Sequence, residues 1–335
     1  MKAQHIRMAA AVFLSAIGVW WFVHDIAWSE VVAVLGTIRV EWVAVAAFAL
    51  LGEFLIRALR WAILLRPLGV SVRIPDLWAA TVIGATVNTL IPLRAGEIAK
   101  PMVASRRTGL RLSTLFATNV MERVFDLLGL VSILVLMVVL LPATSGDDLL
   151  VANLYRYGSW IGFGAFGAMM VFFLLATRGP QARGAFERIL SIAPEPARRP
   201  FLHLFDGFVL GLGSSRSRTS VLHAAALSVL MWLNGAIAIW CLFQAFRVPL
   251  PFAAACFTGV AIALTVALPQ APGFIGVFHV AIEKAMTLWG LAPHESKGFA
   301  LVFWAVSFVP VTIVGLVAMW REGLSVRDVQ NTREE

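Results

Sequence analysis

The sequence has few charged residues. Only 14% of its 335 residues are Asp, Glu, Lys or Arg, whereas about 25% is usual in soluble domains. The chain is 60% hydrophobic, and its apolar runs approach the roughly 20 residues that a helix needs to cross a hydrocarbon core of about 30 Å. This composition excludes a water-soluble enzyme and predicts an all-α, polytopic membrane protein.

Cysteine and catalytic motifs are scarce as well. The two cysteines, Cys241 and Cys256, lie in apolar runs without CxxC or His-rich spacing, so we expect neither a disulfide framework nor a metal site. The sequence contains no GxSxG motif, no P-loop and no HExxH motif. We therefore expect no cofactor and no chemical catalysis.

The charge that is present has a basic excess, with a net charge of +8. No segment outside the apolar runs is long enough for a folded basic domain, so nucleic-acid binding is not expected. The longest polar connection, 178–218, is rich in arginine and is therefore expected in the cytoplasm. Lys2 and Arg7 place the N-terminus on the same side.

These charges decide which apolar segments cross the membrane within one integral membrane domain, 1–335. If 77–93 crossed, basic residues 106–111 and the loop 178–218 would both lie outside. A re-entrant hairpin over about 76–111 keeps them inside, and the same reasoning makes 252–290 a second hairpin that enters from the opposite face. The expected spans are about 8–23, 41–65, 112–141, 157–177, 219–246 and 298–320.

Both hairpins contain helix-breaking Pro and Gly, at 92–96 and 268–276. Two broken segments in opposed halves are typical of transporters in which the binding site lies between inverted repeats. The alternative is a chain with two proline kinks and miscounted spans. Either interpretation places a polar interior near the breaks, because irregular backbone at membrane depth needs polar partners.

Ionisable residues inside spans are candidates for function because burying them in lipid is costly. In the second span, Glu53, Arg57 and Arg60 share one helix face. Glu53 is expected to pair with Arg57 and to leave Arg60 free for a ligand. Alternatively, both arginines extend to the cytoplasmic interface.

The first hairpin turn brings together an amide, a guanidinium, a carboxylate and free backbone groups. Its residues are Asn88, Pro92, Arg94, Gly96, Glu97 and Lys100. Such a set suits an anionic headgroup, because arginine binds phosphate in a bidentate manner and helix N-termini attract anions. An internal pair between Arg94 and Glu97 that only stabilises the turn is the alternative.

The fourth span carries Glu122, Arg123 and Asp126, with the two carboxylates one turn apart. Arg123, Arg94 or Arg57 are expected to neutralise their repulsion. A counter-ion set for a cationic lipid, a gating lattice, a proton relay and simple neutralisation of the arginines all remain open.

The second hairpin offers a further set, Pro269, Gln270, Pro272, Gly273, Gly276, His279 and Glu283. His279 and Glu283 are four residues apart on one helical face, so the pair is able to titrate near neutral pH. A hydrogen-bonded structural histidine is the alternative.

Four motifs resemble, in order and spacing, the lysylphosphatidylglycerol synthase transmembrane family, also called the flippase-like domain family. They are Arg57-x-x-Arg60-Trp61, Asn88-x-x-x-Pro92-x-Arg94-x-Gly96-Glu97, Glu122-Arg123-x-x-Asp126 and Pro272-Gly-Phe-Ile-Gly276. The resemblance implies a bacterial or archaeal plasma-membrane protein linked to lipid translocation. Many relatives have Glu where this chain has His279. Because the chain ends about 15 residues after the last expected span, aminoacyl-transferase activity is not implied.

The sequence thus favours a flippase or transporter for an anionic or aminoacylated phospholipid, a hopanoid or a polyprenyl-linked lipid in the bacterial inner membrane, with both termini cytoplasmic. One rival is a membrane-embedded transferase or hydrolase that acts on a polyprenyl-phosphate lipid, with Glu122 or Asp126 as its base. Another is an accessory subunit of a lipid-modifying synthase. Expected partners are membrane lipids with an anionic headgroup, with a synthase partner and a homo-oligomer left open.

Overall fold

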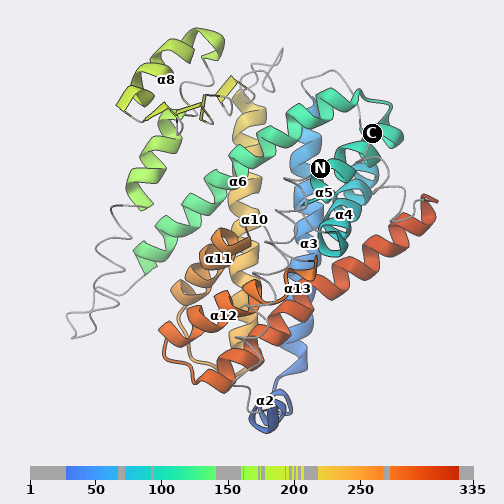
Figure 1. The fold of residues 1–335 in the computed structure, drawn as a ribbon, viewed down its shortest axis with the longest axis vertical. Coiled ribbons are helices and arrows are strands. Elements are labelled where there is room, and N and C mark those ends of the chain that lie inside the picture. The colour runs from blue at the N-terminus through green and yellow to red at the C-terminus, as the bar shows by residue number, and fades with distance from the viewer. Residues whose placement is uncertain are drawn as a thin grey trace, which may run out of the picture. The chain divides into compact units, whose positions relative to one another are not determined.

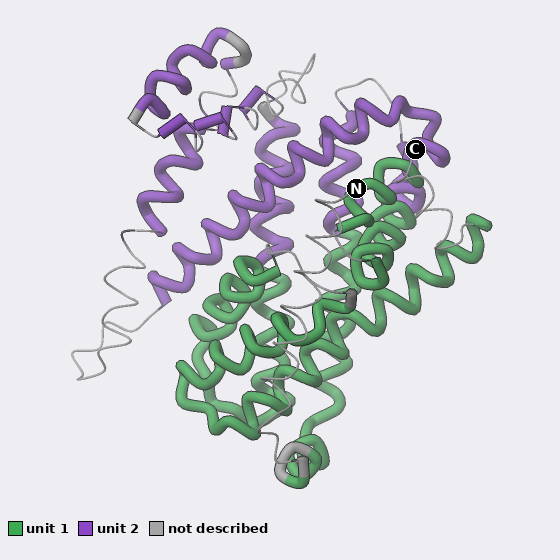
Figure 2. The backbone as a smooth tube through the Cα atoms, viewed as in Figure 1, with its two compact units in different colours: residues 1–55, 78–103, 233–335 green, residues 56–77, 104–232 purple. Residues whose placement is uncertain are grey.

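A computed structural model describes residues 28–66, 72–91, 94–140, 218–266 and 272–323, and most of 160–174 and 178–206. The described residues form helices, turns and connecting segments, without a β-strand among them. They fall into two compact units, which Figure 2 colours separately. Unit 1 comprises Met1–Leu55, Trp78–Val103 and Leu233–Glu335, and unit 2 comprises Ile56–Leu77 and Ala104–Trp232.

The main helices follow one pattern twice along the chain: long, short, short, long (Figure 1). The first set is α3 (Val40–Leu65), α4 (Ile74–Leu90), α5 (Gly96–Thr108) and α6 (Leu112–Leu140), with 26, 17, 13 and 29 residues. The second set is α10 (Arg218–Ala245), α11 (Phe252–Val266), α12 (Val277–Leu288) and α13 (Pro293–Arg321), with 28, 15, 12 and 29 residues. The smaller elements are α2 (Trp28–Leu35), η2 (Gly179–Ala182), α8 (Arg183–Ile189), η3 (Leu190–Ile192) and η4 (Pro272–Phe274).

The four long helices are apolar and long enough to cross a membrane. They correspond to the expected spans 41–65, 112–141, 219–246 and 298–320. The last helix begins five residues earlier than expected, because Pro293 occupies its first turn and Glu295 Oε2 accepts a hydrogen bond from Ala292 N at 3.3 Å. The expected span 8–23 lies outside the described residues, and 157–177 is described only in part, with an apolar helix over Gly162–Phe172.

Helices α4 and α5 form a tight antiparallel hairpin. Near the turn, Gly96 N donates to Asn88 Oδ1 at 2.7 Å. On each helix, four residues farther from the turn, Gly84 packs against Lys100. An added Cβ on Gly84 would lie 2.7 Å from Lys100 Cβ. An added Cβ on Gly96 would collide with the Gly84 carbonyl oxygen. Glycine is therefore what lets the two backbones approach so closely.

At the open end of this hairpin, Asp76 in the first turn of α4 binds two arginines. Arg107, near the end of α5, places Nη1 2.7 Å from Asp76 Oδ1, and Arg73 Nε lies 2.8 Å from Asp76 Oδ2. The Asp76 side chain is only 8% exposed, and Arg107 at 25% is more shielded from water than Arg73 at 81%. The hairpin is thus held together at its turn and at its base.

Helices α11 and α12 also pack against each other, with a break between them. The Phe257 ring of α11 lies 6.3 Å from the Trp289 ring just beyond α12, which places the start of α11 near the end of α12. In the break, Gly273 and Gly276 have φ values of 74° and 90°, and Phe274 has 56°. Helix cannot continue through three residues with positive φ, so the chain reverses here.

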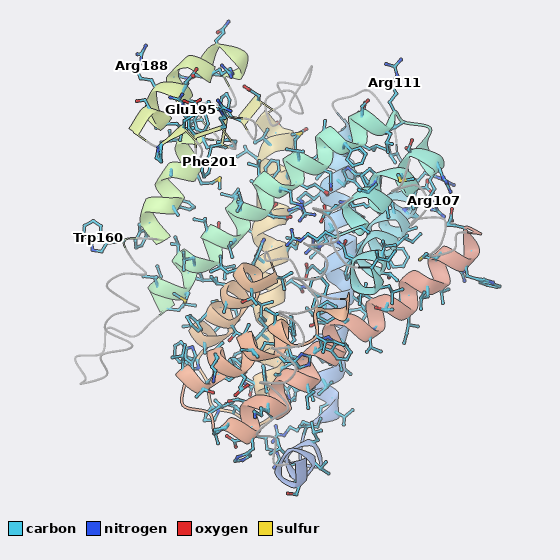
Figure 3. All side chains as sticks on the ribbon, in the orientation of Figure 1. Arg107, Arg111, Trp160, Arg188, Glu195 and Phe201 are labelled. Atoms are coloured by element: carbon cyan, nitrogen blue, oxygen red, sulfur yellow. The ribbon has the colours of Figure 1, made fainter. Side chains whose placement is uncertain are left out.

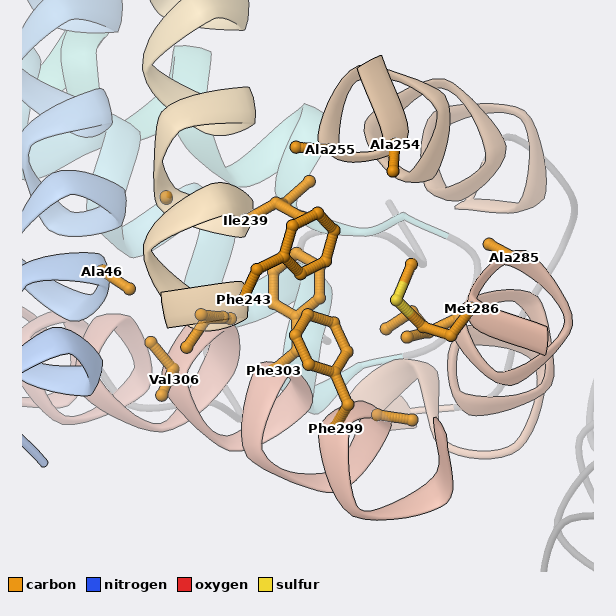
Figure 4. Close-up of a cluster of buried hydrophobic side chains, with 14 of the residues drawn as sticks. Ala46, Ile239, Phe243, Ala254, Ala255, Ala285, Met286, Phe299, Phe303 and Val306 are labelled. Atoms are coloured by element: carbon orange, nitrogen blue, oxygen red, sulfur yellow. The ribbon is translucent and has the colours of Figure 1, made fainter. Parts of the chain in front are cut away.

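The core of unit 1 is an aromatic and aliphatic cluster made by α3, α10, α11, α12 and α13 (Figure 4). Phe243 of α10 and Phe299 of α13 lie together at its centre, with ring centroids 5.4 Å apart, and Phe303 lies 6.0 Å from Phe299. Met286 reaches the same cluster from α12. This cluster packs α11 and α12 against the long helices α10 and α13.

Unit 2 has its own core, in which Phe186 of α8 stacks on Phe205 at 4.5 Å and both rings contact Phe172. This cluster attaches the arginine-rich segment 178–206 to the apolar helix before it. Arg188 projects outward from that segment (Figure 3), and Phe201 is 52% exposed. Arg183 donates to Asp206 at 2.8 Å, and this bond raises the pKa of the guanidinium.

Candidate functional site

A buried ion-pair network lies in unit 2, between the membrane-spanning helices α3 and α6. Arg60 of α3 is 1% exposed, and its Nη2 lies 2.8 Å from Asp126 Oδ1 of α6. The second oxygen of Asp126 accepts a hydrogen bond from Arg123 Nη1 at 3.1 Å. Arg60 Nη1 also donates to Ser228 Oγ of α10 at 2.8 Å, so one guanidinium joins three helices.

This geometry corrects the expectation that Arg60 is free for a ligand, and equally the alternative that it extends to the interface. Arg60 pairs with Asp126 because full burial of an unpaired guanidinium would be prohibitively costly. The expected pairing of Asp126 with Arg123 is confirmed, but Arg60 was missed as its second partner. Ser228 was missed as well, because a serine inside an apolar span does not by itself indicate which helix it contacts.

The other candidate residues of unit 2 surround this network. Glu122, one turn before Asp126, is 2% exposed. Arg57 is partly buried, and it and Arg123 both interact electrostatically with Asp126. Three arginines and two carboxylates thus belong to this group.

The first helix break lies in unit 1 and centres on Arg94. Arg94 has a φ of 56° and is exposed, and its Nη2 donates to the Val266 carbonyl oxygen at 2.6 Å. Val266 is the last residue of α11, so this bond joins the first break to the second. In the first turn of α5, the backbone N–H of Glu97 donates to Arg94 O at 3.0 Å.

The second break is held by α13. Trp304 Nε1 donates to the Gly273 carbonyl oxygen at 2.7 Å, and its ring lies 5.7 Å from that of His279. His279 and Glu283 are buried, at 3% and 6% exposure. Sequence reasoning named the glycines, His279 and Glu283 but missed Trp304, which is one of 12 tryptophans without a distinguishing local signal.

Helix α13 also contacts the first hairpin. Thr86 Oγ1 of α4 donates to the Val311 carbonyl oxygen at 3.2 Å. One turn later, Gly315 packs so closely on Thr86 that an added Cβ would collide with its hydroxyl. One long helix therefore supports both breaks of unit 1.

The candidate residues thus fall into two groups, one in each unit. The group of unit 1 presents the N-termini of α5 and α12, where backbone N–H groups and the helix dipole favour an anion. Arg94 adds a positive charge and keeps further guanidinium donors beyond the bond to Val266. Among the described residues, no three His, Cys, Asp or Glu side chains form a metal-binding group. This chemistry fits a phosphate-bearing ligand.

Comparisons with known proteins agree with a multi-pass membrane protein. Residues 8–315 match the family described as "Lysylphosphatidylglycerol synthase TM region". The chain is 25% identical to a "UPF0104 membrane protein" of Methanothermobacter thermautotrophicus over 292 residues, 83% of each chain. It is 35% identical to "Glycosyltransferase AglD" of Haloferax volcanii over 120 residues, which are 36% of this chain and 19% of that protein. No solved structure matches.

Proposed function

Since the chain belongs to the lysylphosphatidylglycerol synthase TM region family, we propose that it moves a lipid with an anionic headgroup between the leaflets of a membrane. The observation that carries this proposal is the hydrogen bond from Arg94 to the end of α11, which joins two helix breaks in unit 1. Broken helices that meet in this way form the binding sites of many transporters.

The two short-helix pairs are re-entrant hairpins in this proposal. At about 1.5 Å per residue, the 17 residues of α4 span about 25 Å and the 15 residues of α11 about 22 Å, less than a hydrocarbon core of about 30 Å. Each helix therefore enters the membrane and turns back. The cytoplasmic placement of the arginine-rich segment 178–218 makes the two hairpins enter from opposite faces.

The two residue groups have different roles. Arg94 and the N-termini of α5 and α12 bind the headgroup while the acyl chains stay in lipid. The network around Arg60 and Asp126 fixes α3 against α6 and α10. The protein works in a bacterial plasma membrane with both termini in the cytoplasm.

The test uses the full chain in proteoliposomes with fluorescent phosphatidylglycerol, whose movement is followed by quenching of the outer leaflet. Arg94→Gln removes one charge-assisted contact, worth about 1.5–3 kcal/mol, so we expect movement to slow by about 10- to 100-fold. Arg39→Gln is the matched control, because Arg39 is an exposed arginine of the same unit. Equal rates for Arg94→Gln and the wild type would contradict the headgroup assignment.

The relative named as a glycosyltransferase supports a second candidate, a membrane-embedded transferase or hydrolase for a polyprenyl-phosphate lipid. Because the chain spans only 19% of that relative, its activity is not carried over directly. Glu122 or Asp126 would be the base in this candidate, and each Asp126 oxygen lies close to an arginine nitrogen. Mass spectrometry of polyprenyl-phosphate lipids incubated with the purified protein separates the candidates, since only the enzyme changes lipid mass.

A further inference from the structure

Glu283 of α12 is a buried acid that the proposed headgroup site does not use. Glu283 is 6% exposed as a whole residue, and its Oε2 has no hydrogen-bond partner among the described residues. Within the described part of the chain, the nearest cation is Lys284, whose Nζ lies 3.9 Å from Glu283 Oε1. The Lys284 side chain is 55% exposed. This is weak compensation for a carboxylate inside an apolar helix bundle, where an ionised group needs a close partner or loses its charge.

The groups around Glu283 offer little further compensation. On α12 they are His279, one turn away, and Lys284. Helix α11 contributes no Asp, Glu, Lys, Arg or His. Helix α13 has His294, Glu295 and Lys297 in its first turns, and Glu295 Oε2 is used by Ala292 N. Lys297 is buried but lies in no ion pair with Glu283.

Glu283 is also connected to the second helix break. It lies one turn from His279, whose ring contacts Trp304 at 5.7 Å. Trp304 in turn donates to the Gly273 carbonyl oxygen inside the break. Glu283 thus lies one helical turn from a residue that packs on the tryptophan bound to the break.

We propose that Glu283 binds a proton and that this proton moves with the lipid, which couples lipid movement to a proton gradient. The inference rests on the proposed function. The step is only the reversible protonation of a carboxylate by water-borne H⁺, and a proton that travels with a singly charged anionic lipid makes the movement electroneutral. A metal cation fits less well, because it needs several oxygen ligands and Lys284 would repel it.

The test compares rates of phosphatidylglycerol movement with and without a pH gradient in the same proteoliposomes. For the wild type, the rate with a gradient of about one pH unit should exceed the rate without it by up to about tenfold, if one proton moves with each lipid. For Glu283→Gln we expect a ratio near unity, because glutamine cannot take up a proton. Glu41→Gln, at an exposed glutamate of the same unit, should keep the wild-type ratio.

A second readout measures proton binding without transport. Dicyclohexylcarbodiimide reacts with protonated carboxyl groups in apolar surroundings, so mass spectrometry of the detergent-solubilised protein should find Glu283 modified, and less so as the pH rises. The inference would be overturned if the rate of lipid movement by the wild type did not change with the pH gradient, or changed with a sodium gradient instead. The proposed function would still stand. If no lipid moves at all, the proposed function fails, and an unmodified Glu283 then overturns proton binding as well.

Discussion

At the scale of single residues, the cost of burying charge distinguishes two arginines. Arg60 is almost fully buried and is matched by Asp126 and Ser228, whereas Arg94 stays exposed and donates to a backbone carbonyl. The charge of Arg60 is neutralised within the protein, whereas the charge of Arg94 remains available to a ligand. The structure thereby separates an arginine that holds helices together from one suited to a ligand.

The pair between Arg60 and Asp126 makes a direct prediction for stability. Asp126→Asn leaves Arg60 buried without its counter-ion, so we expect the free energy of unfolding to fall by about 3–5 kcal/mol. Denaturant unfolding in detergent micelles, followed by tryptophan fluorescence, measures this change. The double variant Arg60→Met/Asp126→Leu removes both charges and should recover most of the loss.

The matched control is the exposed pair between Arg199 and Glu195, whose side chains are 73% and 57% exposed. Glu195→Gln should cost less than about 1 kcal/mol, because solvent screens the pair. If Asp126→Asn cost no more than this control, the network would not hold α3 against α6.

At the scale of elements, short helices and small residues shape the molecule. Helices α4 and α5 meet at Gly84 and Gly96, and α13 meets α4 at Gly315. Small residues at such contacts let helix backbones approach closely, which is how helices associate without a hydrophobic driving force between them. The breaks are therefore embedded in tightly packed helices, and their position does not depend on loop conformation alone.

Alanine substitution of glycine should consequently have opposite effects at two positions. Gly96→Ala forces α5 away from Gly84 and Asn88, so we expect a loss of about 1–3 kcal/mol in the free energy of unfolding. Gly52→Ala, inside α3 with nothing within 4 Å of the added Cβ, should gain up to about 1 kcal/mol. The unfolding assay in micelles checks both, and a neutral Gly96→Ala would refute the close packing.

At the scale of the whole molecule, the repeated order of long, short, short and long helices is the main architectural finding. Two copies of one helix order, each with a central break, are also found in many transporters with inverted repeats. The family match over 8–315 covers both copies.

Opposed hairpins predict that their open ends face opposite sides of the membrane. Arg111→Cys, just after α5, should react with a membrane-impermeant maleimide from the cytoplasmic side, and Leu288→Cys, at the end of α12, from the outside. Arg111 is exposed (Figure 3) and Leu288 is 47% exposed. The native Cys241 and Cys256 are at most 3% exposed and should stay silent. A membrane-permeant maleimide controls for reactivity, and labelling of both variants from one side would rule out inverted hairpins.

The sequence by itself determined that this is an all-helical membrane protein and its family, and it located the four long helices of the described residues. These properties follow from hydropathy, from Pro and Gly and from short motifs, all of which are local along the chain. Only the tertiary structure decided that Arg60 pairs with Asp126, that Arg94 binds the end of α11, 172 residues away, and that Trp304 holds the second break. Such pairings depend on which faces of distant helices meet, and helix periodicity places a residue on a face without naming its partner.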